Sequence, residues 1–175
     1  MKPTVEEIKQ LLKYEDGFVY HRADKRGTTI KAGGIAMDSM KGGKTGGGYK
    51  VGFISGFKKI YRTHVVIWAM HNGRWPLDGL EIDHINHNKT DNRIENLREV
   101  SRVEQNRNMT MNKTNTSGHS GVQFRKQRNK WRAYINEHNK QIPLGHFDTK
   151  EQAIAARKKA EVEMGFHPNH GKAAV

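Results

Sequence analysis

The residues of this 175-residue chain with the clearest chemical potential lie between Leu80 and Arg98. The stretch opens with a short apolar alternation that predicts a half-buried strand. Asp83 and His84 stand side by side where that strand would end, and a largely polar segment follows until Ile94. A carboxylate is a hard oxygen ligand for a divalent cation, and a neutral imidazole accepts a proton from water. The pair therefore predicts metal-assisted hydrolysis.

The segments 83–86 (Asp-His-Ile-Asn) and 91–98 (Asp-Asn-Arg-Ile-Glu-Asn-Leu-Arg) resemble the core of HNH homing endonucleases of phages and group I introns. The resemblance implies a ββα-metal unit, in which strand, loop, strand and helix surround one cation. It further implies that Asp83 is a metal ligand and that His84 is the general base. Asn96 would hydrogen-bond this base and fix its orientation. The implied cofactor is Mg²⁺ or another divalent cation such as Mn²⁺.

The second protein ligand that the resemblance implies departs from the family pattern. The family has an Asn nine positions after the residue that matches Asn96, and this chain has Gln105 there, with Asn106 next to it. Successive helix residues point about 100° apart, so the two cannot serve interchangeably on a rigid helix. Either Gln105 reaches the metal with one more methylene group, or the helix is shifted and Asn106 binds it, or the site is weakened. The register favours Gln105.

The charge distribution favours a nucleic-acid partner. The formal net charge is +13, and it divides into +7 for residues 1–80, −1 for 81–110 and +7 for 111–175. Basic flanks suit a polyanion backbone and an acidic centre suits a cation, so we expect double-stranded DNA as the partner. A basic surface that only keeps the protein soluble is the plainer alternative, but it does not explain why the positive charge lies in the two flanks and not in the centre.

Composition excludes several other classes of protein. Without Cys the chain forms no disulfide and no thiolate zinc site. No apolar run approaches the ~20 residues that span a bilayer, and the first residues lack the apolar core of a signal peptide. We therefore expect a cytoplasmic protein (in the host cell if a phage encodes it) with no membrane association and no obligate protein partner.

The first part of the chain predicts several elements that would surround the polar stretch. They are a helix at 5–13, a strand at 18–20, a hairpin of strands 49–54 and 57–61, and a helix at 63–71. A helix at 102–109 would follow the polar stretch. His64, where the family often has a His, is either a packed core histidine or part of the site. The residue after it is Val65, where the family usually has Arg.

A second unit is predicted after an unpatterned linker at 111–117. Three strands at 121–125, 130–135 and 140–147 precede a helix at 150–164. This unit resembles the Apetala/ethylene-response-factor DNA-binding domain, and the residues that carry the likeness are Gly121, Val122, Lys130, Trp131, Ala133, Ile135, Leu144, Gly145, His146, Phe147, Thr149 and Ala153. In that family the sheet enters the major groove. The plainer alternative is a basic hairpin with a buried Trp131.

Candidate DNA contacts follow from both resemblances. Arg93 and Arg98 are candidates for clamping a phosphate. On the sheet of the second unit, the positions carried over are Gln123, Arg125, Arg128, Lys130, Trp131, Arg132 and Tyr134. The family's first sheet Arg is Gln123 here and the first hairpin is one residue longer, so base specificity does not transfer.

Together these patterns predict an α+β chain. An HNH nuclease domain at 1–110, with a ββα-metal core at 80–109 and a β-hairpin extension, precedes a domain at 118–175 with a three-stranded antiparallel sheet and one helix. The expected activity is metal-dependent endonuclease action of the homing type on DNA, by nicking or double-strand cutting. The alternative is a sequence-specific DNA-binding protein whose nuclease unit is inactive. An RNA-directed nuclease is a weaker third reading, since no single-strand stacking motif is present.

Overall fold

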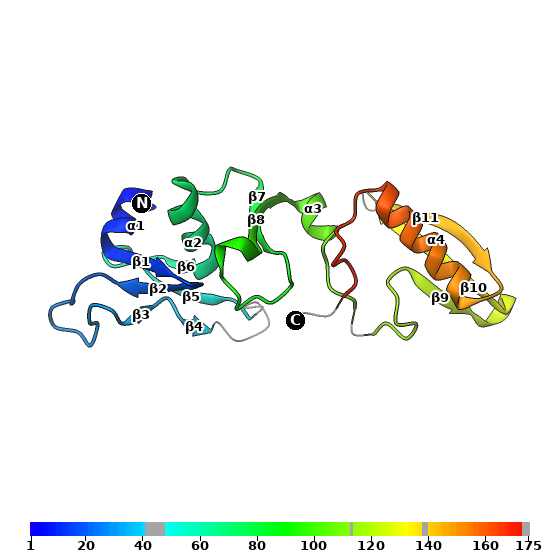
Figure 1. Cartoon of the computed structure of the whole chain (residues 1–175), viewed down its shortest axis with the longest axis horizontal. Coiled ribbons are helices and arrows are strands. Elements are labelled where there is room, and N and C mark those ends of the chain that lie inside the picture. The colour runs from blue at the N-terminus through cyan, green and yellow to red at the C-terminus, as the bar shows by residue number, and fades with distance from the viewer. Residues whose placement is uncertain (41–47, 113, 138–139, 173–175) are drawn as a thin grey trace. The chain divides into compact units, whose positions relative to one another are not determined.

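The computed structural model of the chain describes residues 1–40, 48–112, 114–137 and 140–172 (Figure 1). In these ranges the chain forms four α-helices and four small antiparallel sheets, so the fold is mixed α and β. None of the helices described is long and apolar enough to cross a membrane.

The chain divides into two compact units, Met1–Ser101 and Arg102–Val175. The predicted nuclease domain, 1–110, therefore extends past the end of the first unit, and the predicted core at 80–109 includes residues of both units. The domain limits stay a prediction.

The first helix, α1 (Val5–Leu11), begins at a capping box formed by Thr4 and Glu7. It is shorter than predicted, because Leu12 is already extended and β1 (Leu12–Glu15) starts there. The cause is the tight turn at Asp16 and Gly17, whose φ angles are 42° and 81°. This turn pairs β1 with β2 (Phe18–His21), so residues 12–15 satisfy their backbone groups in a sheet.

Two small sheets complete the N-terminal half. β3 (Ile35–Ala36) extends the β1-β2 hairpin, and β4 (Ser39–Met40), β5 (Lys50–Phe53) and β6 (Ile60–Arg62) form the second sheet in that order. The predicted hairpin is present as β5 and β6, with Phe53 opposite Ile60. Gly52 is required there, because a Cβ would lie 2.4 Å from the Cα of Met37.

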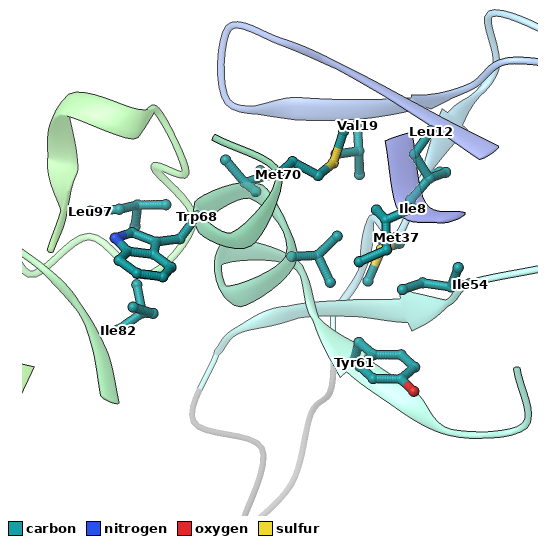
Figure 2. Close-up of a cluster of buried hydrophobic side chains, with 13 residues drawn as sticks. Ile8, Leu12, Val19, Met37, Ile54, Tyr61, Trp68, Met70, Ile82 and Leu97 are labelled. Carbon is teal, nitrogen blue, oxygen red and sulfur yellow. The ribbon is translucent and has the colours of Figure 1, made fainter. Parts of the chain in front are cut away.

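Helix α2 (Thr63–Asn72) follows β6 directly and ends at Gly73, which adopts a left-handed φ of 70°. It lies where the sequence predicts it, and seven of its residues are buried, so it forms the centre of the core of the first unit. Figure 2 shows Trp68 of α2 between Ile82 and Leu97. These two residues come from the hairpin described next, so Trp68 fixes that hairpin to the helix.

The hairpin consists of β7 (Leu80–His84) and β8 (Leu97–Ser101), with a short 3₁₀ turn, η1 (Ile94–Asn96), before β8. The register pairs Asp83 with Arg98 and His84 with Leu97. Successive strand residues point to opposite faces. His84 therefore shares the inner face with Ile82, while Asp83 projects from the other face.

The second unit contains α3 (Arg102–Asn106), β9 (Val122–Arg125), η2 (Lys126–Arg128), β10 (Lys130–Glu137), β11 (Lys140–Phe147) and α4 (Lys150–Glu163). The sheet order is β11-β10-β9 and all pairs are antiparallel, as the sequence predicts. Helix α4 packs on one face of the sheet, with Ala153 against Val122 and Ala133 (Figure 1). The predicted helix at 102–109 is shorter and ends at Asn106.

The segment after α4 folds back onto the residues that follow α3. His167 N donates to the Arg107 carbonyl at 3.0 Å, and Gly171 N donates to the Met109 carbonyl at 2.8 Å. The Arg107 side chain forms an ion pair with Glu137 of β10 at 3.0 Å. We call residues 165–172 the C-terminal segment.

Candidate functional site

His84 lies at the end of β7, where its ring is 3% exposed. Its Nε2 is 3.0 Å from Oδ1 of Asn92, a residue that is 1% exposed. Because Oδ1 has no proton to give, Nε2 carries the ring proton and Nδ1 holds the lone pair of the neutral imidazole. Burial lowers the pKa of His84, although Asn92 and the carboxylates of Asp83 and Asp91 oppose this effect. The ring is therefore neutral at pH 7, and this is the form of an imidazole that can accept a proton.

Asp83 lies next to this imidazole in sequence, on the opposite face of the hairpin. Its Oδ2 accepts a hydrogen bond of 3.1 Å from Nη2 of Arg98, the residue opposite it on β8. Its side chain is 14% exposed. Carboxylate oxygens are the hard ligands that divalent cations such as Mg²⁺ prefer.

The loop between β7 and β8 is held by a network of Asn and Asp side chains. Asn96 accepts from Asn86 N through Oδ1 at 2.9 Å, and its Nδ2 donates to Asn86 Oδ1 and to the Asp91 carbonyl. The Asn86 side chain in turn donates to Asp91 Oδ2 at 2.8 Å. This network explains how the loop accommodates polar residues between two apolar anchors, since Asn86, Asp91 and Asn96 satisfy one another.

Arg93 closes the same loop. Its Nε and Nη2 donate to the two oxygens of Asp91 at 2.9 and 2.8 Å, a bidentate pair. These bonds lower the pKa of Asp91 to about 2, with further help from the Asn86 amide. The backbone beside Arg93 rests on the β1-β2 hairpin, because Ile94 N donates to Tyr14 Oη at 3.2 Å and a Cβ at Gly17 would meet Arg93 N at 3.1 Å. The hairpin at residues 12–21 therefore supports the loop that carries Asn92.

Two aromatic rings lie beside His84. His64 of α2 is 1% exposed, and its ring centroid is 4.8 Å from that of His84 in an edge-to-face arrangement. It stands four residues before Trp68, on the same face of α2, which is the face that meets the hairpin. Tyr49 lies 4.9 Å from His64 and 5.9 Å from His84 between ring centroids. Burial lowers the pKa of His64 to about 3, so this second imidazole is also neutral.

The structure brings several of the predicted site residues into one region, and it adds residues that sequence reasoning missed. Asp83, His84, Arg93, Arg98 and Asn96 all belong to the β7-β8 hairpin and its loop. The hydrogen bond to the His84 ring comes from Asn92, whereas the Asn96 side chain bonds within the loop. Asn92 and Tyr49 carried no signal as single residues, since their role depends on which atoms the folded loop brings together.

The predicted ligands on the helix, Gln105 and Asn106, lie on α3 in the second unit. Their contact with a metal stays a prediction. Among the described residues, no three His, Cys, Asp or Glu side chains cluster as a complete ligand set. Mg²⁺ is ordinarily held by one or two carboxylates together with substrate phosphates and water, so the single carboxylate of Asp83 is a suitable protein ligand for it.

The predicted DNA contacts of the second unit lie mainly on one face of its sheet. Cross-strand pairs place Arg125 opposite Lys130 and Gln123 opposite Arg132. Arg132 also lies over the ring of Tyr134, two residues along the same strand, at 5.2 Å. These five side chains share the face opposite α4, because alternate strand residues point the same way.

The remaining two candidates of this unit lie elsewhere. Trp131 faces the α4 side and packs against the Val122 cluster, with Phe124 at 5.2 Å between ring centroids. Trp131 contributes to packing there. This is the structural role that the sequence predicts as the plainer alternative to a DNA contact. Arg128 is exposed in η2, the turn between β9 and β10.

The chain is similar to known proteins over part of its length. The profile of a family described as HNH endonuclease matches residues 61–107, which include α2, the hairpin and α3. Protein 3.8 of Escherichia phage T7 is 38% identical over 85 residues, which cover 49% of this chain and 69% of that protein. No solved structure matches the chain significantly. The likeness of the second unit to the Apetala domain stays a prediction.

Proposed function

The chain belongs to the HNH endonuclease family, and we propose that it is a metal-dependent DNA endonuclease of the homing type that hydrolyses phosphodiester bonds. The observation that supports this most is the His84 ring, which is buried, neutral and oriented by Asn92. A positioned neutral imidazole is the group that removes a proton from water in such hydrolysis.

In the proposed mechanism His84 is the general base. Asn92 holds the proton on Nε2, so Nδ1 takes the proton of the attacking water. Its neighbours His64 and Tyr49 exclude solvent from one side of the ring. The carboxylates of Asp83 and Asp91 stabilise the imidazolium that forms. Asn96 acts indirectly, because its side chain holds the loop on which Asn92 lies.

The cofactor in this proposal is Mg²⁺, or another divalent cation such as Mn²⁺. Asp83 would supply a carboxylate oxygen, and Gln105 or Asn106 would supply an amide oxygen. When bound, the cation would stabilise the negative charge that develops on the phosphate and the leaving oxygen. Arg98 holds the Asp83 carboxylate through the hydrogen bond across the hairpin.

The proposed substrate is double-stranded DNA, which the basic face of the second unit would hold by its backbone. Arg93, whose side chain is 58% exposed, is free to leave Asp91 for a phosphate. One active site cuts one strand per visit, so a monomer would nick, and a double-strand break would need a dimer or two visits. The similarity to a phage protein supports a phage-encoded enzyme that works in the host cytoplasm.

The test is conversion of supercoiled plasmid to open circle by the purified full chain with Mg²⁺. We expect cutting by the wild type, none with EDTA, and none by His84→Ala. His119→Ala is the matched control, since His119 lies in the second unit and should cut at the wild-type rate. Plasmid that carries the sequence of the source organism belongs in the same series, because a homing-type enzyme prefers its own target.

Binding separates this function from the alternative of an inactive nuclease unit. In a gel shift, His84→Ala should bind DNA nearly as well as the wild type. A wild type that binds DNA specifically but cuts no plasmid would favour the DNA-binding alternative. The presence of Gln105, where the family has Asn, also supports that alternative. If that alternative holds, Asp83→Ala should leave function unchanged, while removal of residues 111–175 should abolish it.

A further inference from the structure

Two positive side chains converge on the Tyr49 ring from different parts of the first unit. Arg62, the last residue of β6, lies with its Cζ 5.1 Å from the ring centroid. Lys89, in the loop between β7 and η1, lies with its Nζ 4.9 Å from the same centroid. Tyr49 itself precedes β5. Three segments that are distant in sequence thus bring two cations to one aromatic side chain.

This arrangement lies beside the proposed general base. The Tyr49 centroid is 5.9 Å from that of His84. The charge on Lys89 acts on His84 and the charge on Arg62 acts on His64, which places both cations within electrostatic reach of the two imidazoles. None of the predicted site residues accounts for this positive charge, since Arg93 and Arg98 are paired with Asp91 and Asp83.

The two cations have no acidic partner in the described part of the chain, and both side chains are exposed. Other exposed basic residues of the same unit do have one, as Lys13 has Glu15 and Lys31 has Asp24. A cation over an exposed ring gains only about 0.5–1 kcal/mol. Two like charges at one ring also repel each other, and an anion placed between them offsets that repulsion.

We propose that Tyr49, Arg62 and Lys89 form a phosphate-binding platform that holds the DNA backbone next to His84. This inference rests on the proposed function, because it names how that site takes up its substrate. Arg62 supplies a planar guanidinium that can bond two phosphate oxygens, and Lys89 supplies a point charge. The Tyr49 hydroxyl, which lies near the charges of Arg62 and Asp83, completes the platform as a hydrogen-bond donor.

The test compares the full-length variants Arg62→Gln and Lys89→Gln with Lys9→Gln, a control that removes an exposed charge from α1. Equilibrium binding to linear plasmid DNA in EDTA is measured between low and moderate salt. Each phosphate contact contributes about 0.9 to the log-log slope, so each platform variant should lower the slope by about 0.9 and the control should not. Single-turnover cleavage should fall about 10- to 100-fold for the platform variants only.

Tyr49→Leu and Tyr49→Phe complete the series. Tyr49→Leu removes the ring that fixes both cations and should reduce cleavage more than Tyr49→Phe, which removes only the hydroxyl. Unchanged thermal unfolding midpoints establish that the variants are folded, and Lys89, on an exposed loop, carries the test if Arg62→Gln is unstable.

The outcomes separate this inference from the proposed function. A wild type that cuts DNA, with slopes and rates unchanged in Arg62→Gln and Lys89→Gln, would overturn the platform and leave the nuclease standing. Lower slopes in Arg62→Gln and Lys89→Gln, together with a wild type that cuts no DNA, would support the platform as a DNA-binding site and count against the nuclease.

Discussion

At the scale of single residues, the candidate site depends on which Asn contacts His84, the proposed base. Asn92 is almost fully buried, and the residues described around it give its Nδ2 no hydrogen-bond partner. A buried amide that is only half satisfied costs free energy, so stability alone does not account for Asn at this position, and a functional requirement for Oδ1 does. Asn96 differs, because its side chain makes three bonds that close the loop.

This difference predicts opposite consequences for two similar substitutions. Asn92→Ala should lower the cleavage rate about 10- to 100-fold, because His84 loses the partner that fixes its tautomer, and should change stability by only about 1 kcal/mol. Asn96→Ala should lower the free energy of unfolding by about 2–3 kcal/mol, since it leaves buried loop groups unpaired. Single-turnover rates and urea unfolding measure both. Equal losses of stability would contradict this assignment.

The loop also predicts a dependence of stability on pH. The pKa of Asp91 is lowered to about 2 in the folded chain, below the value of about 3.9 for an unperturbed Asp. A lowered pKa stabilises the fold above the unfolded value, and this contribution is lost as pH falls toward 2. The stability difference between the wild type and Asp91→Asn should therefore be full at pH 6 and shrink between about pH 4 and 2. Urea unfolding at these pH values measures it, and a difference that is constant with pH would refute the idea.

At the scale of elements, the β7-β8 hairpin keeps its position through α2. Trp68 lies between Ile82 and Leu97, and His64, one turn before Trp68, meets His84. Helix packing and the geometry of the base are therefore one structural unit. Sequence patterns predicted α2, the β5-β6 hairpin and the strands β9, β10 and β11 of the second unit, because apolar spacing and turn residues mark them.

Apolar spacing and turn residues did not predict the other elements. β1 was missed because a capping box and apolar spacing both favoured continuing α1, and the turn at Asp16-Gly17 overrode them. β3 and β4 contain two residues each, too few for any period. The bond from Asn92 to His84 depends on the path of a loop, which no local pattern encodes.

Packing between α2 and the hairpin yields a prediction at this scale. Leu97→Ala should lower the free energy of unfolding by about 2–5 kcal/mol, because it leaves a cavity beside Trp68. It should also weaken cleavage, since Leu97 is the residue opposite His84 in the register. Val162→Ala, at an 81% exposed position on α4, is the matched control and should have no effect on either. A change of less than about 1 kcal/mol for Leu97→Ala would argue against this packing.

At the scale of the whole molecule, the second unit is closed by its own C-terminal segment. The Phe166 ring is contacted by the guanidinium groups of Arg107 and Arg157, whose Cζ atoms lie 5.8 and 5.3 Å from its centroid. Arg157 is 5% exposed and donates to the Tyr134 carbonyl at 2.8 Å. The residues after α3, the sheet and the end of the chain therefore stabilise one another.

Removal of residues 165–175 should accordingly destabilise the second unit alone. The two backbone bonds to Arg107 and Met109 are worth about 1 kcal/mol each, so we expect a loss of at least about 2 kcal/mol, with lower affinity for DNA. Hydrogen exchange measures each unit separately, and amides of residues 1–101 should keep their protection. Equal loss of protection in both units would contradict this independence.

The attachment of residues 107–109 to the C-terminal segment limits how such a protein could exchange its second unit, the proposed DNA-recognition module, by recombination. A crossover at 111–117, where the sequence shows the best linker, would keep α3 with the nuclease but sever both backbone bonds from the C-terminal segment. A crossover between Ser101 and Arg102 would preserve those bonds, and Gln105 and Asn106 would then travel with the incoming module. In the second case, inheritance of a new DNA preference would bring with it a new candidate metal ligand, which links the choice of target to the choice of cation.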